Sequence, residues 1–170
     1  MPERWDELEA TDSAGVPDPV MNIQLRAATS ADHPLLHSLN RAAYEALATR
    51  LFGSWDDIAQ RARFEEKIQR LPFRIIELEH QPVGAISSSE HEDHVFLDEL
   101  VILPELQSRG IGSRVLLLEL REAHACKKPL RLHTARLNRA QEFYRRHGFV
   151  ETGRDEMFIN MESRGWCQSG

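Results

Sequence analysis

The segment from Leu100 to Arg114, LVILPELQSRGIGSR, contains the residues whose types and spacing point most directly to chemistry. An apolar strand is predicted to end at its proline, and Gly110 and Gly112 stand where a helix is predicted to begin. Glycines there let an anionic ligand approach the backbone, and the free N–H groups of a first helical turn bind phosphate oxygens. Arg109 adds positive charge. The segment therefore predicts a diphosphate site, and a glycine-eased turn with exposed arginines is the alternative interpretation.

The same segment differs from the common nucleotide-binding loops. It lacks the lysine followed by serine or threonine of a Walker A loop. Its Gly-Ile-Gly is also not the GxGxxG fingerprint that follows the first strand of a dinucleotide-binding domain. ATP, GTP and NAD are therefore not favoured as ligands.

Two segments together resemble the motifs of the GNAT superfamily of N-acetyltransferases: PELQSRGIGS and, further along the chain, NRAQEFYRRHGF. In that family a Gln/Arg-x-x-Gly-x-Gly/Ala turn joins the fourth strand to the third helix, and Gln107, Gly110 and Gly112 stand at those positions. The second motif, an asparagine and then Tyr-x-x-x-Gly-Phe, is matched by Asn138, Tyr144, Gly148 and Phe149. The resemblance covers residues 23 to about 162 and implies an acetyl-CoA-dependent N-acetyltransferase.

The resemblance also implies which residues contact acetyl-CoA. In the family the pantetheine arm follows the backbone of the fourth strand, and the pyrophosphate binds the N–H groups of the turn before the third helix. Asn138 is expected to contact the arm from the other side, and Tyr144 is expected to lie near the sulfur. The remaining implied cofactor-binding residues are Leu100, Val101, Ile102, Gln107, Ser108, Arg109, Gly110, Ile111, Gly112 and Ser113.

Tyr144 is the predicted general acid. When an amine attacks the thioester, CoA leaves as a thiolate. A phenol with a pKa of about 10 can hydrogen-bond to, or protonate, a thiolate whose conjugate acid has a pKa of about 8.5. The only other tyrosine, Tyr44, matches no catalytic motif. The alternative for Tyr144 is a core tyrosine packed beneath Phe149.

The general base is predicted among the carboxylates of the fourth strand, Asp98 and Glu99. An ammonium ion must lose a proton before it attacks. Strand alternation sends the two side chains to opposite faces, so only one is expected to face the substrate. Several family members carry their catalytic glutamate further upstream, where this chain has Phe96. A water relay, or a solvent-facing or ion-paired role for each carboxylate, is therefore the alternative.

Apolar periods predict the elements that position these residues. Thr29 and Asp32 form a predicted capping box before a first helix. A second helix, capped by Ser54 and ended by Pro72, is expected to place Trp55 and Ile58 on apolar faces. Further helices are predicted at 110–125 and 138–147, and strands at 23–27, 73–79, 83–90, 94–103, 129–135, 149–153 and 156–161. Residues 80–82 form the predicted turn between the second and third strands.

The predicted fold class is α/β with mixed α+β character. The strand, helix and strand on either side of residues 110–125 predict a parallel pair, and the last two strands predict a hairpin. The resemblance adds the GNAT fold, in which a central mixed, mostly antiparallel sheet of six to seven strands is flanked by about four helices. In that fold the parallel pair is splayed around the cofactor.

The length and charge of the chain limit how its domains can be organised. Its 170 residues predict one domain, and its formal net charge is −6. Of that charge, −5 falls in residues 1–22, which are predicted to be an acidic, disordered tail. The GNAT domain is expected at 23–162 and a second tail at 163–170. This acidity argues against non-specific binding to nucleic acid or to anionic membranes.

The cysteines predict a reducing, cytoplasmic setting, because Cys126 and Cys167 are too few for a disulfide framework. No signal peptide or membrane span is predicted. Two histidine pairs have spacings that a metal could use, but no metal site is predicted from them: His33 with His37, and His91 with His94. His133 is a candidate for the substrate pocket, with a packed strand histidine as the alternative.

The predicted function is direct transfer of an acetyl group to a primary amine of a small molecule by a monomer or homodimer. In the family, acceptor specificity comes from the first two helices, their loop and the last hairpin, so residues 51–64 are candidates here. A protein or peptide N-acetyltransferase and a non-catalytic acyl-CoA-binding sensor are the two alternatives.

Overall fold

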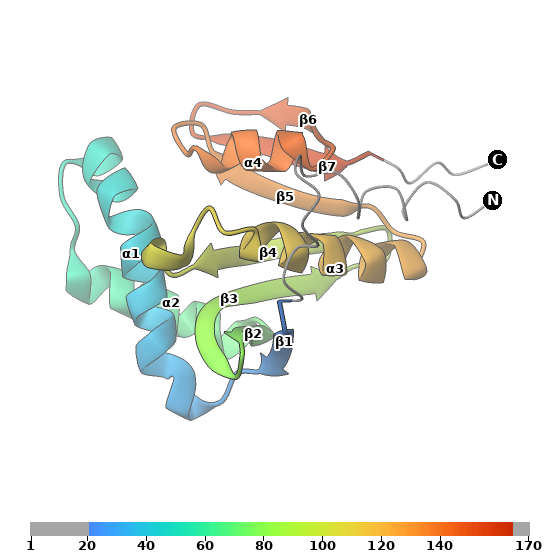
Figure 1. The fold of residues 1–170 in the computed structure, drawn as a ribbon. Helices are drawn as coiled ribbons and strands as arrows, with labels where there is room; N and C mark the ends of the chain where they lie inside the picture. The colour runs from blue at the N-terminus through green and yellow to red at the C-terminus, as the bar shows by residue number, and fades with distance from the viewer. Residues whose placement is uncertain (1–20, 165–170) are drawn as a thin grey trace.

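Seven strands form one sheet in the order β1-β2-β3-β4-β5-β7-β6 in a computed structural model of the chain, which describes residues 21–164 (Figure 1). The strands are β1 Ile23–Ala27, β2 Phe73–Leu78, β3 Gln81–Glu90, β4 Val95–Ile102, β5 Leu130–Ala135, β6 Phe149–Arg154 and β7 Phe158–Ser163. The α-helices are α1 His33–Phe52, α2 Asp57–Arg70, α3 Ile111–Ala125 and α4 Ala140–Arg146. Short 3-10 helices lie at Ser30–Asp32 and Pro104–Leu106.

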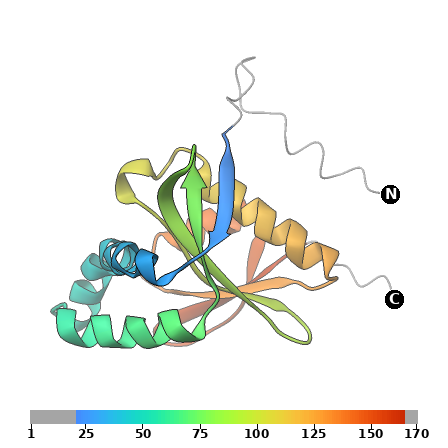
Figure 2. The ribbon, with the colours of Figure 1, turned by 90° about the horizontal axis from the view of Figure 1, so that it is seen from below.

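The sheet is antiparallel except where β4 pairs with β5 (Figure 2). The predicted fold class, the antiparallel run β2-β3-β4, the parallel pair and the closing hairpin are all confirmed. One feature was not predicted: β7, the last strand, lies between β5 and β6. The hairpin therefore joins the sheet through its second strand.

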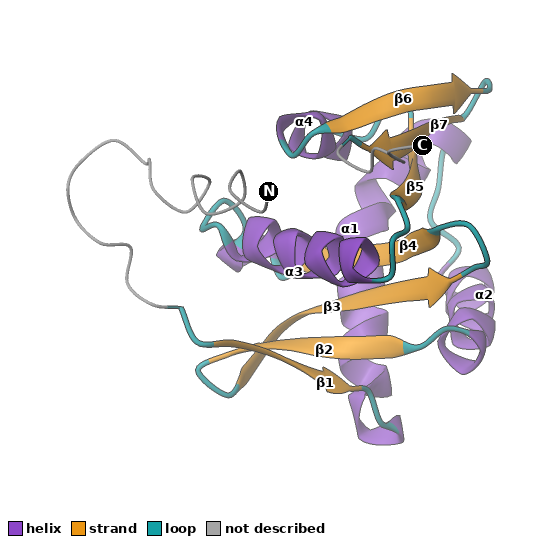
Figure 3. Cartoon of the chain, turned by 90° about the vertical axis from the view of Figure 1, so that its right-hand side faces the viewer, coloured by secondary structure: helices purple, strands orange, loops and turns teal. Residues whose placement is uncertain are grey.

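Helices cover both faces of the sheet, with α3 and α4 on one face and α1 and α2 on the other (Figure 3). A large apolar cluster fills the α3 and α4 face, and a smaller one fills the α1 and α2 face. The first includes Ile86, Ile102, Val115, Leu132, Tyr144 and Met161, and the second is Leu36, Leu39, Phe64, Phe73, Ile75 and Ala85. A strand residue can therefore be assigned to a face by the cluster that it joins.

The start of the first helical segment follows its sequence signal. Asp32 Oδ2 accepts a hydrogen bond from the Thr29 N–H at 2.8 Å, which is half of the predicted capping box. Arg26 donates to both oxygens of the same carboxylate, at 2.8 and 2.9 Å. This fork ties β1 to the beginning of α1.

The start of α2 differs from the prediction. Asp56, and not Ser54, is the N-cap, and its Oδ1 accepts from the Ala59 N–H at 3.0 Å. Trp55 therefore precedes the helix, and its indole N–H donates to Asp57 Oδ1 at 3.2 Å. Ile58 is 83% exposed, so the expected apolar position is wrong. The buried side of α2 begins only at Phe64, because the N-terminal part of the helix lies beyond the core.

The turn between β2 and β3 is also shorter than predicted. Glu79 and His80 both have positive φ, 48° and 64°, and Leu78 pairs with Gln81. Two left-handed central residues are the mark of a two-residue type I′ hairpin, which Asn-Gly usually forms. Because neither residue has that preference, the turn was placed one residue late, and Pro82 lies inside β3.

The predicted tails fall mostly outside the described residues, since residues 1–20 and 165–170 are not described. At the N-terminal boundary, Met21 is partly buried and packs against the larger apolar cluster. At the C-terminal boundary, β7 continues to Ser163, one residue past the expected end of the domain.

Candidate functional site

A β-bulge in β4 determines where the two candidate carboxylates point. Ser87 of β3 pairs with Glu99, but Ser88 pairs with Leu97, so Asp98 is the extra residue. Asp98 Oδ2 accepts from the Ser89 hydroxyl at 2.6 Å. The hydroxyl of Ser88 bonds to Glu119 of α3, so Ser89, its neighbour in the strand, faces the α1 and α2 side.

Glu99 faces the same side, because its carboxylate contacts Tyr44 of α1 and Lys67 of α2. The prediction that alternation separates Asp98 and Glu99 is therefore wrong. A bulge places two consecutive side chains of one strand against a single partner position, so regular alternation is interrupted. Both carboxylates therefore lie on the α1 and α2 face of the sheet.

The carboxylate of Glu99 is held by two partners from different helices. The Tyr44 hydroxyl donates to Oε2 at 2.6 Å, and Lys67 Nζ forms an ion pair with Oε1. The Glu99 side chain is 7% exposed. Burial raises the pKa of Tyr44 well above its ordinary value, and the negative charge of Glu99 adds to the effect. Tyr44 therefore stays a hydrogen-bond donor.

Tyr44 is the site residue that sequence reasoning missed. It lies two helical turns after Leu36, a buried residue of the same helix. That spacing could have placed Tyr44 on the sheet-facing side of the first helix. Nothing in the sequence indicated that a β4 carboxylate would meet it.

Tyr144 lies on α4 and approaches the same carboxylate. Its ring packs edge-on against Phe143 and Phe149, with centroids 5.2 and 5.5 Å away. Burial raises the pKa of Tyr144, and the charge of Glu99 raises it further. Among residues 21–164, its hydroxyl has no hydrogen-bond partner. The fold thus brings Tyr144 near Glu99 and leaves its hydroxyl group available.

Strands β4 and β5 separate just beside these side chains. They pair only at Val95 with Leu130 and at Phe96 with Arg131. Beyond Phe96, β4 continues to Ile102 and pairs with β3 alone. The backbone N–H and C=O groups of residues 97–102 that point toward β5 therefore have no strand partner and can bind a ligand. The structure places Leu100, Val101 and Ile102, the predicted backbone contacts of acetyl-CoA, along this opening.

The turn before α3 has the geometry of an anion site. Ser108 and Gly110 both have positive φ, 61° and 81°, and Gly110 is the N-cap of α3. The N–H groups of the first turn, at Ile111, Gly112 and Ser113, have no acceptor inside the helix. These groups and the helix dipole attract negative charge. The turn therefore suits the pyrophosphate of CoA.

Two predicted residues also make contacts that fix the local backbone. Gln107 Nε2 donates to the Ile102 carbonyl at 3.0 Å and so holds the turn against the end of β4. Asn138 Oδ1 accepts from the Ala140 N–H at 2.9 Å at the start of α4. Gly112 lies close to α4, since a Cβ there would be 3.6 Å from Phe143 Cζ. The remaining predicted residue of the turn, Arg109, is exposed.

The side chains of the two histidine pairs named in the sequence analysis contact other side chains of the protein. His33 and His37 both approach Glu65, at 3.2 and 2.9 Å. His91 and His94 stack with centroids 4.5 Å apart. In the described part of the chain, no group of three or more potential metal ligands occurs.

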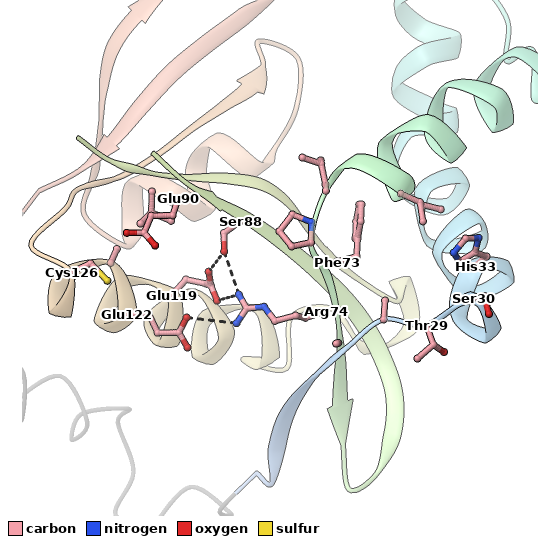
Figure 4. A pocket seen from close by; sticks show the side chains of 17 residues that line it. Thr29, Ser30, His33, Phe73, Arg74, Ser88, Glu90, Glu119, Glu122 and Cys126 are labelled. Atoms are coloured by element: carbon pink, nitrogen blue, oxygen red, sulfur yellow. Dashed lines mark hydrogen bonds and ion pairs between the residues drawn. The ribbon is translucent and has the colours of Figure 1, made fainter. Parts of the chain in front are cut away.

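A cavity of about 560 Å³ lies away from this site, where β4 begins and α3 ends (Figure 4). Its polar centre is Glu119, whose side chain is 1% exposed and pairs with Arg74. Ser88 donates to Glu119 at 2.6 Å, and Arg74 also lies 3.6 Å from Glu122. These contacts tie α3 to β2 and β3. The residues predicted for catalysis do not line this cavity.

Comparison with known proteins agrees with this geometry. The model of the acetyltransferase (GNAT) domain family matches residues 70–151, which include β4, the turn and α4. Residues 70–151, just under half of the chain, are similar to a GNAT acetyltransferase domain. The protein is an acyltransferase, and acetyl-CoA is its cosubstrate. The prediction drawn from the motifs is thus confirmed.

Solved structures share the fold at low sequence identity. PaiA N-acetyltransferase from Thermoplasma acidophilum, in complex with coenzyme A, is 19% identical with a TM-score of 0.69, covering 85% of this chain and 100% of its own. YjaB from Escherichia coli, in its apo form, is 23% identical with a TM-score of 0.62, covering 85% and 99%. The ribosomal-protein-S18-alanine N-acetyltransferase from Escherichia coli is 16% identical with a TM-score of 0.61, covering 83% and 92%.

A search of curated proteins found no match to this chain. Among the described residues, no helix is both long and apolar enough to cross a membrane.

Proposed function

We propose that this acetyltransferase domain transfers the acetyl group directly to a primary amine of a small molecule. The observation that supports this proposal is the opening between β4 and β5, bordered by Asp98, Glu99 and Tyr144. When bound, acetyl-CoA supplies an activated acetyl thioester. The domain then has to hold the thioester, accept a proton from the amine and stabilise the leaving sulfur. Cys126 is free, in keeping with the cytoplasmic location that the sequence predicts.

The residues proposed to hold acetyl-CoA lie on three elements. Backbone groups of residues 100–102 face the opening, and the N–H groups of residues 108–113 surround the start of α3. Gln107 fixes the turn, and Asn138 at the start of α4 is proposed to contact the arm from the other side. These donors are polar backbone groups with a helix dipole behind them, which is the chemistry that amide and phosphate groups require.

Tyr144 is proposed to act on the sulfur as a hydrogen-bond donor. Because burial raises its pKa, the hydroxyl keeps its proton at neutral pH. A neutral donor stabilises the negative charge that develops on the leaving sulfur and can pass a proton to it. The edge-on packing against Phe143 and Phe149 fixes the ring in place.

Asp98 and Glu99 are proposed to have different roles. Glu99 is buried and already holds Lys67 and Tyr44, so its oxygens are occupied. Asp98 is half-buried and accepts one bond from Ser89. We therefore propose that the acceptor binds Asp98 as an ammonium ion and that Asp98 takes up the proton that this ion must lose. Glu99 is a positioning residue that fixes α1 and α2 against β4.

Replacement of Tyr144 by phenylalanine tests the proposed mechanism. Tyr144→Phe keeps the ring packing and removes the hydroxyl, so kcat should fall at least about tenfold, which corresponds to about 1.4 kcal/mol. The affinity for CoA, measured by calorimetry, should change little. Phe143→Leu on the same helix disturbs the packing of the Tyr144 ring without removing a donor, so it measures how much of the loss comes from ring position alone. A Tyr144→Phe enzyme with wild-type kcat would remove this role.

Acceptor identity is tested by a screen for CoA release. Small amines, amino acids, aminoglycosides and peptides are offered in turn with acetyl-CoA. Release on small amines supports the proposal. Release on peptides alone would favour a protein acceptor, as the name of the Escherichia coli ribosomal-protein-S18-alanine enzyme states for that protein. Tight CoA binding without release on any acceptor would favour the non-catalytic sensor.

A further inference from the structure

Three aromatic side chains form a row across strands β4, β5 and β7. Phe96 and His133 have ring centroids 5.4 Å apart, and His133 and Phe158 have centroids 5.3 Å apart. His133 is exposed, and Phe158 is 39% exposed. We refer to Phe96, His133 and Phe158 as the ring row. The ring of His133 therefore packs against other rings at the surface and does not lie inside the core.

The ring row lies on the face opposite α3 and α4. In β5, Leu132 is buried in the α3 and α4 cluster, so His133 points the other way. In β7, Ile159 is buried in the same cluster, which sends Phe158 to the face of His133. Among the described residues, the apolar cluster beneath α1 and α2 includes residues of β2, β3 and β4 but none of β5 or β7. The rings therefore remain accessible.

The ring row adjoins the opening between β4 and β5. Phe96 belongs to the last pair of residues that join the two strands, and the bulge follows it directly. Asp98 lies on the same face as Phe96, about 7 Å further along β4 at roughly 3.3 Å per residue. A carboxylate and an aromatic surface are thus presented side by side where the acetyl group would be delivered.

Two further exposed apolar side chains lie in loops near the Phe158 end of the sheet. Leu137, in the loop after β5, is 48% exposed, and Met157, in the turn before β7, is 41% exposed. The Arg136 N–H donates to the Met157 carbonyl at 2.9 Å, so the two loops lie at the same end of the sheet. Apolar surface gathered beside a polar group marks a ligand site more often than apolar residues scattered singly do.

We infer that the acceptor is an aromatic primary amine, whose ring stacks on Phe96, His133 and Phe158 and whose ammonium group binds Asp98. This inference rests on the proposed transfer to a small amine and names the class of amine. Stacked or edge-on aromatic pairs contribute beyond the area that they bury, which favours an aryl group over an alkyl group of similar size. Because Phe96 and Asp98 lie about 7 Å apart along β4, we expect a short alkyl linker between the ring and the nitrogen.

The test compares two amines of similar size, 2-phenylethylamine and 2-cyclohexylethylamine. The ratio of their kcat/KM values should exceed five in favour of the aromatic amine. Phe96→Leu and Phe158→Leu retain apolar volume but remove a ring, so each should lower that ratio at least threefold, mainly through KM. His80→Asn removes an exposed ring at the distant β2–β3 turn and should leave the ratio unchanged, because asparagine tolerates left-handed backbone.

A binding measurement gives an independent readout. Calorimetry of 2-phenylethylamine with the CoA-saturated protein should show binding that weakens at least threefold in Phe96→Leu. Equal kcat/KM values for the two amines, or a ratio that the ring variants do not alter, would overturn the inference while transfer to amines still stands. CoA binding without release on any amine would remove the proposed function itself. A change of sedimentation coefficient in Phe158→Leu would instead assign the ring row to contact between two copies of the chain.

Discussion

Asp98 and Glu99 are adjacent in sequence, share one face of the sheet and have different surroundings. Asp98 accepts a hydrogen bond from a hydroxyl group of β3, whereas Glu99 contacts two helices through Tyr44 and Lys67. The sequence identified both carboxylates as candidates, but a regular strand would have separated them. The bulge that brings them together depends on how β3 and β4 pair, and no local residue preference indicates it.

This difference predicts different effects of removing each charge. Asp98→Asn should lower kcat/KM at least about tenfold and leave the free energy of unfolding nearly unchanged. Glu99→Gln leaves Lys67 without its anionic partner, so it should lower the free energy of unfolding by about 1–3 kcal/mol. Urea unfolding and CoA release measure the two quantities. The opposite pattern, in which Glu99→Gln is stable but inactive, would exchange the proposed roles.

Asp32 predicts an effect of pH on stability. The Arg26 guanidinium holds the pKa of Asp32 below its usual range, and the Thr29 N–H adds to this. Because the folded-state pKa is the lower one, the contact stabilises the fold above the unfolded pKa of about 4 and is lost as pH falls below it. Asp32→Asn should lower stability by about 1 kcal/mol at pH 7. Urea unfolding at pH 3 should show a smaller difference, and an equal difference at both pH values would contradict this origin.

At the scale of elements, apolar periods together with cap and turn residues were sufficient for the type of every described α-helix and strand and for their order along the chain, but not for the two short 3-10 helices. Boundaries were missed where side-chain contacts decide them, as at Asp56, or where turn residues lack the usual preference, as at Glu79 and His80. The turn before α3 was predictable as a candidate phosphate site because its glycines and its position between a strand and a helix are visible in the sequence. The partners of Glu99 come from residues 32 and 55 positions away in the chain, and such pairings follow only from the fold.

Gly84 tests how closely β3 and β4 approach each other. A Cβ at this position would overlap the Val101 carbonyl oxygen and lie 2.9 Å from Ile102 Cδ1. Gly84→Ala should therefore push β3 away from β4 and lower the free energy of unfolding by at least about 2 kcal/mol. Gly153→Ala is the matched control, because its Cβ would meet Asn160 Nδ2 at an ordinary 3.7 Å. Chemical unfolding of both variants measures the difference, and equal stability would show that the strands can separate without cost.

At the scale of the whole molecule, the net charge says little about the acceptor. Most of the −6 lies in residues 1–22, whereas residues 23–162 carry −2. In the proposed function, local groups therefore determine recognition: backbone N–H groups would bind phosphate, and Asp98 beside the ring row would bind an amine. The acidic composition of the chain is not a sign of a strongly cationic partner.

Removal of residues 1–20 tests whether recognition is independent of the acidic N-terminal segment. The shortened chain has a net charge of −1 and keeps Met21, which packs against the core. Its kcat/KM for a given amine should remain within about twofold of the full-length value, because the shortened chain retains every residue proposed for the site. CoA release by both chains is compared at the same ionic strength. A loss of tenfold or more would assign a role in the site to the acidic segment.

The position of β7 affects how the domain is assembled during synthesis. Since β6 reaches the sheet only through β7, residues 149–154 have no strand partner until residues 158–163 have left the ribosome. Until then the edge of β5 that pairs with β7 also has no partner strand. The nascent chain therefore passes through a stage in which five strands are complete and both the β5 edge and β6 are exposed. Contacts with chaperones or with other unfinished chains would act most strongly at this stage, before β7 closes the sheet.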